Sequence, residues 1–124
     1  MKDARKQLGD SAEALAAKYL KDKDYRVLAR QYKKIFGEID LVCQDGDEVV
    51  FVEVKSLASS EYGYPEQAVT SEKIGHILKV SEEYLTKNHL QDSPWRIDVV
   101  AIEYQSDPPT ITHIEAIDIP EQYW

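Results

Sequence analysis

The chain has 124 residues, 43% of them hydrophobic, which fits a single domain, residues 1–124, with one core. It has no run near the ~18 apolar residues of a membrane span, no apolar signal segment, and only Cys43 as a cysteine, so we expect a cytoplasmic protein without disulfides or a membrane partner. The net charge is −8, but residues 1–36 hold 10 basic and 5 acidic residues and so net +5. This asymmetry leaves two interpretations open: a basic part that contacts nucleic acid, or an acidic protein with exposed lysines.

Apolar residues at helical spacing predict a first helix over about residues 7–22. They are Leu8, Ala12, Leu15, Ala16, Tyr19 and Leu20. Asp10 begins a pattern typical of a helix N-terminus. Glu13 has two interpretations that periodicity cannot separate: it closes a capping box with Asp10, or it supplies a carboxylate to a site on the neighbouring strands.

A basic strand and a β-hairpin follow this helix. Residues 25–33 alternate and predict the strand, which we expect to pair with the hairpin in a three-stranded meander. In the hairpin, residues 38–44 alternate, with Ile39, Leu41 and Cys43 on one face. Residues 48–55 are rich in β-branched side chains, and a turn signal lies between the two runs.

The hairpin register decides which charged side chains meet. A turn at Asp45-Gly46 places Asp40 opposite Phe51, whereas a turn at Gly46-Asp47 places it opposite Glu53. In both registers Asp40, Glu53 and Lys55 share one face, and only a longer loop or a bulge would separate them.

Two carboxylates this close repel each other, and a divalent cation is the simplest reason to keep them together. Carboxylate oxygens suit Mg²⁺ or Mn²⁺, and the carbonyl of Val54 can add a neutral ligand. Lys55 can orient a water molecule or stabilise developing negative charge. The pattern therefore predicts a metal-dependent hydrolytic site at Asp40, Glu53 and Lys55.

The second half of the chain predicts a helix and two strands. The composition of residues 56–65 is typical of a loop, in which Tyr62 and Tyr64 either stack on a base or pack on the domain. A helix is expected over residues 70–88. Its first turn holds Lys73, a cation that opposes the helix dipole and so indicates an acidic or phosphate neighbour.

Strands are expected over residues 95–104 and 110–117, which gives the order α-β-β-β-α-β-β. We expect a mixed sheet of the α+β type, in which the strands before and after the second helix run parallel.

Several sequence segments together resemble the YraN-type family, small bacterial proteins with a restriction-endonuclease-like fold. The matching residues span about residues 8–117: Gly9, Glu13–Ala16, Tyr19, Leu20, Gly37–Leu41, Phe51–Lys55, Gly63, Pro65, Ala68, Val69, Lys73 and Arg96–Val100. The Asp40 and Glu53-Val54-Lys55 spacing is similar to the D…(D/E)-x-K signature of restriction-endonuclease-like nucleases. The chain departs from the family at Leu57, where a basic residue is usual, and at Ala12 and Gln31, where Gly and Asn are usual.

The resemblance implies a metal site at Glu13, Asp40 and Glu53 with Lys55. By analogy with the fold, it also implies a nuclease that acts on branched, nicked or single-stranded DNA rather than on a specific sequence, with DNA favoured over RNA as the partner. Lys73, Arg30 and Lys33 are candidate contacts for substrate phosphates. The alternative is a non-catalytic nucleic-acid or protein interaction module with a vestigial site. A protein partner or a homodimer is compatible with either function.

Overall fold

The computed structural model describes residues 4–57 and 69–124, with side chains from residue 11 onward within these ranges. Its elements are α1 (Ala4–Asp22), β1 (Arg26–Lys34), β2 (Gly37–Asp45), β3 (Glu48–Leu57), α2 (Ser71–Lys87), β4 (Trp95–Glu103), β5 (Thr110–Ile114) and the 3-10 turn η3 (Glu121–Tyr123). This order and the mixed α+β architecture confirm the restriction-endonuclease-like fold class predicted from the sequence. Tyr62 and Tyr64 lie outside the described residues.

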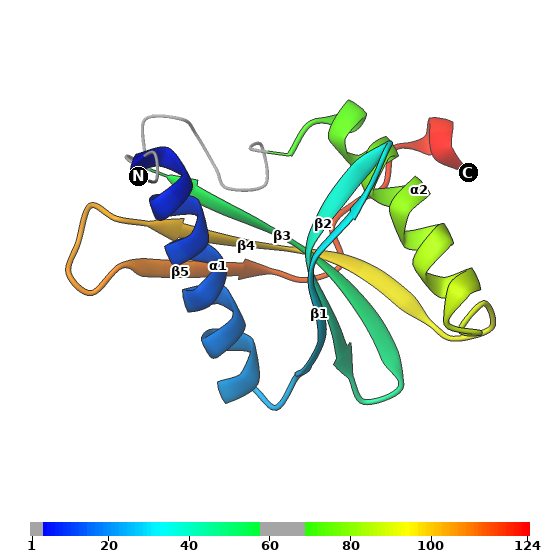
Figure 1. Cartoon of the computed structure of the whole chain (residues 1–124), viewed down its shortest axis with the longest axis horizontal. Helices are drawn as coiled ribbons and strands as arrows, with labels where there is room; N and C mark the ends of the chain where they lie inside the picture. Colours follow the sequence, from blue (N-terminus) through cyan, green and yellow to red (C-terminus); the bar gives the residue numbers. More distant parts are fainter. Residues whose placement is uncertain (1–3, 58–68) are drawn as a thin grey trace.

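One five-stranded sheet, in the order β1-β2-β3-β4-β5, forms the centre of the fold (Figure 1). Strands β1, β2 and β3 form the predicted antiparallel meander. Helix α2 connects β3 to β4, and these two strands are parallel, as expected. Strand β5 returns antiparallel to β4. The sheet therefore presents two faces, and each is covered by one helix.

The two faces hold separate apolar clusters. Alternate residues of β3, Val50 and Val52, pack with α1 residues such as Ala16 and Leu20. Phe51, which points to the other face, packs with residues of α2. This alternation explains why β3 is apolar on both faces, as a central strand must be. Neither described helix combines the length and apolarity needed to cross a bilayer.

The β2–β3 hairpin has the second of the two registers considered above. Its paired residues run from Leu41–Val52 to Asp45–Glu48, which leaves Gly46 and Asp47 as the two-residue turn. Gly46 has φ of 63°, a left-handed conformation that such turns use and that glycine adopts without strain.

The prediction that Ile39 shares a face with Leu41 and Cys43 is wrong. Leu41 and Cys43 belong to the α1 cluster, whereas Ile39 packs against α2. The β1–β2 register shifts between Val27 and Ala29, and Gln31 has φ of 51°. Such irregularities bend and twist a two-stranded ribbon, so the end of the β1–β2 hairpin lies beside α2 (Figure 1).

Two element ends also differ from the sequence prediction. Helix α1 begins at Ala4, so Asp10 lies inside the helix and not at its N-terminus. Strand β5 ends at Ile114 instead of residue 117, because Ala116 has φ of 50° and turns the chain. The helix expected over residues 70–88 is confirmed as α2, and it is capped by the Thr70 side chain, which accepts a hydrogen bond from the Lys73 N–H.

Candidate active site

The site is built where β2 and β3 separate. Their regular pairing ends at Leu41 and Val52, and the next residue beyond it is Asp40 on β2 and Glu53 on β3. Beyond this point the N–H of Val54 donates a 2.8 Å hydrogen bond to Oδ2 of Asp40. The Asp40 side chain thus supplies an acceptor to the β3 backbone and is fixed at the fork between the strands.

Glu53 is the most buried carboxylate of the site, with 4% of its surface exposed. Two lysines reach its Oε1 atom: Nζ of Lys55 lies 3.8 Å away and Nζ of Lys73 lies 3.6 Å away. Lys55 comes from the same face of β3, and Lys73 comes from the first turn of α2. The acidic neighbour expected for Lys73 is therefore Glu53.

Burial and the charge of nearby carboxylates raise the pKa of both carboxyl groups. Burial is the larger cause for Asp40, and nearby Glu13 also raises its pKa. For Glu53, burial and then the charge of Asp40 raise the pKa from 4.5 to about 7, against the opposing effect of Lys73 and Lys55. Two lysines do not fully compensate two adjacent carboxylates, so the pair favours an additional cation.

This shift predicts a pH-dependent stability of the metal-free protein. Between pH 4.5 and about 7 the folded chain retains a proton on Glu53 that the unfolded chain has released. The free energy of unfolding should therefore fall as the pH rises through this window, by up to about 3 kcal/mol. Urea unfolding at several pH values, with a chelator present, measures the slope.

Glu53→Gln should flatten this dependence of stability on pH. Glu72→Gln should preserve it, because Glu72 is an exposed acid in the first turn of α2, next to Lys73. An unchanged slope in Glu53→Gln would show that Glu53 does not hold the proton.

Glu13 is held by two side chains of β1, and its role as a metal ligand stays a prediction. It is 6% exposed and accepts hydrogen bonds from Nε of Arg30 at 3.1 Å and Nε2 of Gln31 at 3.2 Å. It therefore closes no capping box. It lies close enough to raise the pKa of Asp40, but no group of three or more Asp, Glu, His or Cys residues among the described residues is arranged to hold a metal ion.

The donor set nevertheless fits a divalent cation held by two carboxylates. Mg²⁺ typically keeps several water molecules and binds through one or two carboxylates together with substrate phosphates. Asp40 and Glu53 supply two such groups, and because burial raises the pKa of both, a nearby cation would stabilise their charged forms. The Val54 carbonyl as a further ligand stays a prediction.

The candidate phosphate contacts have different environments. Arg30 forms an ion pair with Glu13, and Lys73 is engaged with Glu53. Lys33 is exposed and forms no ion pair with a described residue. Leu57, which replaces a basic residue usual in the family, is 9% exposed and belongs to the core, so it offers no phosphate contact.

Sequence reasoning missed a buried ionic network on β4 and β5. Asp98 is fully buried and accepts hydrogen bonds from Nε of Arg96 at 2.9 Å and the N–H of Ala116 at 2.9 Å, and its Oδ2 lies 2.7 Å from Nε2 of His113. Burial alone would raise the pKa of Asp98, but these hydrogen bonds lower it below its ordinary value. The two-residue spacing of Arg96 and Asp98 on one strand face was the available signal.

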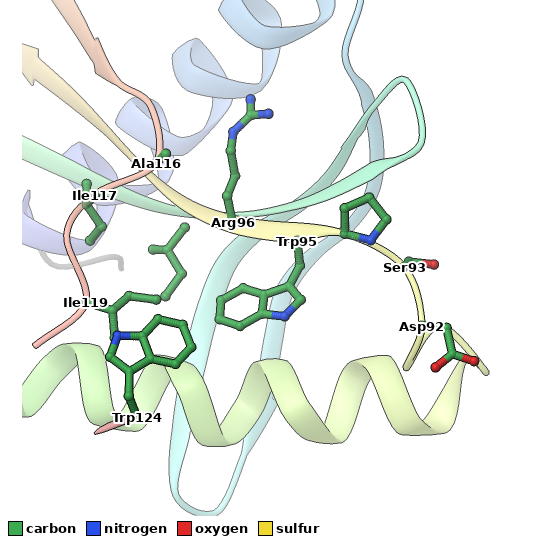
Figure 2. Close-up of a pocket in the computed structure, with 10 residues that line it drawn as sticks. Asp92, Ser93, Trp95, Arg96, Ala116, Ile117, Ile119 and Trp124 are labelled. Carbon is green, nitrogen blue, oxygen red and sulfur yellow. The ribbon is translucent and has the colours of Figure 1, made fainter. Parts of the chain in front are cut away.

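A cavity of about 600 Å³ lies away from Asp40 and Glu53, between the start of β4 and the C-terminal residues (Figure 2). Trp95, Ile119 and Trp124 contribute much of its lining. The Arg96 side chain points away from Trp95 and Trp124 in Figure 2, toward its partners in the buried network. Asp92 is the single acidic side chain among the described residues that line the cavity, so the cavity brings no pair of acidic side chains together.

Comparison with known sequences supports the resemblance inferred above. A sequence model of the family described as "Uncharacterised protein family UPF0102" matches residues 12–102. Similar proteins include the UPF0102 protein of Geobacter metallireducens, 42% identical over 88% of this chain and 89% of its own. The UPF0102 protein of Syntrophomonas wolfei is 41% identical over 88% of this chain and 95% of its own. The chain therefore belongs to the UPF0102 family, which is the YraN-type family expected from the sequence.

Proposed function

We propose that this protein is a Mg²⁺- or Mn²⁺-dependent nuclease that hydrolyses phosphodiester bonds in DNA containing branches, nicks or single strands. The observation that supports this most is the pairing of Asp40 and Glu53 at the β2–β3 fork, with Lys55 beside them. A buried carboxylate beside a half-buried one, both with raised pKa values, is costly for a fold, and a cation-dependent activity gives the pair a function.

Each residue has a separate role in this proposal. Asp40 and Glu53 would hold the cation, which when bound lowers the pKa of water and offsets charge on the phosphate. Val54 fixes the Asp40 carboxylate through its N–H. Lys55 would stabilise negative charge that develops on the phosphate, because its flexible ammonium lies on the same face as the carboxylates. Lys73 would maintain the charge balance of Glu53 from α2.

Lys55→Met should lower the cleavage rate by about 10²-fold, because it removes a cation that acts on the transition state. The substitution keeps much of the aliphatic stem, and the fold should be preserved because Lys55 is partly exposed. Single-turnover cleavage kinetics measure the effect, with Lys21→Met on the distal end of α1 as the control. Parental rates in Lys55→Met would remove Lys55 from the mechanism.

The proposal is tested by incubating labelled single-stranded, duplex, flap and four-way-junction DNAs, and matching RNAs, with the protein in Mg²⁺ or Mn²⁺. We expect cleavage of one or more DNAs that a chelator prevents. Cleavage that persists in the chelator, or no cleavage of any substrate in either metal, would contradict the proposal.

A non-catalytic interaction module is the second candidate. Three ion pairs favour it: Lys55 and Lys73 already partly neutralise Glu53, and Arg30 neutralises Glu13. Such a module would bind members of the same DNA panel at low salt in the chelator, and it would leave them uncut when the metal is added.

A further inference from the structure

The turn between β1 and β2 exposes two large apolar side chains. Lys34 pairs with Gly37, so Ile35 and Phe36 form the whole two-residue turn, which we call the hairpin tip. Ile35 is fully exposed and Phe36 is 39% exposed. In Figure 2 the cyan end of this hairpin extends beyond α2. An adjacent pair of exposed large apolar residues at a projecting turn is unusual and indicates a contact surface.

The fold itself does not require these two residues. Two-residue hairpin turns favour Asn, Asp and Gly, because their common types need positive φ angles. Neither Ile35 nor Phe36 has a positive φ. A β-branched residue at such a turn contributes no packing and no turn geometry, so its presence is better explained by an external partner.

The charge around the tip indicates what this partner is. Residues 26–36 contain four basic residues and no acidic residue, in a chain whose net charge is −8. Lys33 lies on β1, two residues before the hairpin tip. It is exposed and has no ion-pair partner among the described residues. A basic strand that ends in apolar side chains fits a polyanion that also offers flat apolar surfaces, as unstacked bases do.

A shallow groove beside the hairpin tip also combines an apolar side chain with basic residues. It has a volume of about 460 Å³ and lies between Phe36 and the α2 residues Lys79 and Lys87. The groove also contains Glu82 and Glu83, but Glu83 is engaged by Lys34, with Nζ 3.5 Å from its Oε1, and by the hydroxyl of Tyr32. A base stacked on Phe36 would thus have two lysines available for its flanking phosphates.

We propose that the hairpin tip is a wedge that enters a DNA branch point, with Ile35 separating the last base pair and Phe36 stacking on an unpaired base. Apolar side chains inserted between bases act in this way in other DNA-binding proteins. The inference rests on the proposed function, and it names the substrate as DNA with a junction between duplex and single strand.

The position of the tip predicts where such DNA would be cut. Asp40 follows Phe36 by four residues through the start of β2, which is at most about 13 Å of extended chain. Successive base pairs are about 3.4 Å apart along a duplex. Cleavage should therefore fall within about four nucleotides of the branch point, at a constant offset when the branch is moved along the sequence.

The wedge is tested with a forked duplex that contains 2-aminopurine in the last base pair before the fork, in chelator at low salt. Binding of the parent protein should raise the fluorescence, because the probe is unstacked. The Ile35→Ser, Phe36→Ser double variant should lose this rise and bind the fork roughly tenfold more weakly. Leu28→Ser is the matched control, because Leu28 is a 37% exposed apolar residue of β1 away from the tip.

Cleavage of single-stranded DNA separates the wedge from the nuclease. At saturating protein the double variant should still cut single-stranded DNA, because Asp40, Glu53 and Lys55 are unchanged, and it should lose the preference for the fork. A parent that cuts DNA but leaves the probe stacked would overturn the wedge alone. A probe response without any cleavage would support the wedge and contradict the nuclease. If the double variant binds the fork as tightly as the parent and gives the same rise in fluorescence, the wedge would be overturned. Another protein would then be favoured as the partner of the tip.

Discussion

Asp40→Asn should reduce metal-dependent cleavage by about 10³-fold or more and yet raise the stability of the metal-free protein. Asparagine can still accept the hydrogen bond from the Val54 N–H but carries no charge. The Asp40 charge is one cause of the raised pKa of Glu53, so its removal relieves a repulsion. At pH 8 the gain in unfolding free energy should be about 1 kcal/mol. Asp40→Ala should lose the same activity, but its gain in unfolding free energy should be smaller, because the Val54 N–H loses its hydrogen-bond acceptor.

Single-turnover cleavage and urea unfolding on the same preparations measure both effects. Asp47→Asn is the matched control, since Asp47 is an exposed acid in the turn of the same hairpin. It should leave cleavage and stability near the parental values. Cleavage by Asp40→Asn at the parental rate would show that the site has been assigned to the wrong residues.

Asp98→Ala should be the most destabilising single substitution proposed for this chain. Asp98 is fully buried and is the partner of Arg96, His113 and the Ala116 N–H. Its removal leaves the largely buried Arg96 cation without its fully buried carboxylate partner, which should cost about 3–5 kcal/mol. This is a large share of the roughly 5–15 kcal/mol that stabilises a typical domain.

Chemical unfolding followed by tryptophan fluorescence measures this loss, because Trp95 precedes the network on β4. Asp45→Asn is a matched control: Asp45 contacts the same arginine at 3.3 Å, but its side chain is 45% exposed. The control should cost less than about 1 kcal/mol, as exposed ion pairs do. Equal losses in the two variants would contradict the distinction between buried and exposed partners of Arg96.

The sequence was sufficient to predict the central part of the candidate site. Period-two alternation and a turn signal limited the hairpin to two registers, and both placed Asp40, Glu53 and Lys55 on one face. The structure selects the register in which Asp40 and Glu53 are opposed. Lys73 was also singled out correctly, because a cation in the first turn of a helix indicates a compensating acidic neighbour.

Features that depend on tertiary geometry were not predictable in the same way. The displacement of Ile39 toward α2 follows from the irregular, bent β1–β2 ribbon, which simple alternation does not contain. The pairing of Glu13 with Arg30 joins residues 17 positions apart through the packing of α1 on β1. The Asp98–His113 contact needs the β4–β5 register, so periodicity within a single strand could not reveal it.

Binding of Mn²⁺ is the measurement that tests the proposed site most directly, because it requires neither the natural substrate nor a partner protein. Isothermal titration calorimetry of the parent protein should show one site that Mg²⁺ competes for, with Asp47→Asn unchanged. Asp40→Asn and Glu53→Gln should each lose this binding. Equal Mn²⁺ affinity in the parent and both variants, or no binding by the parent at millimolar Mn²⁺, would contradict a metal centre at Asp40 and Glu53.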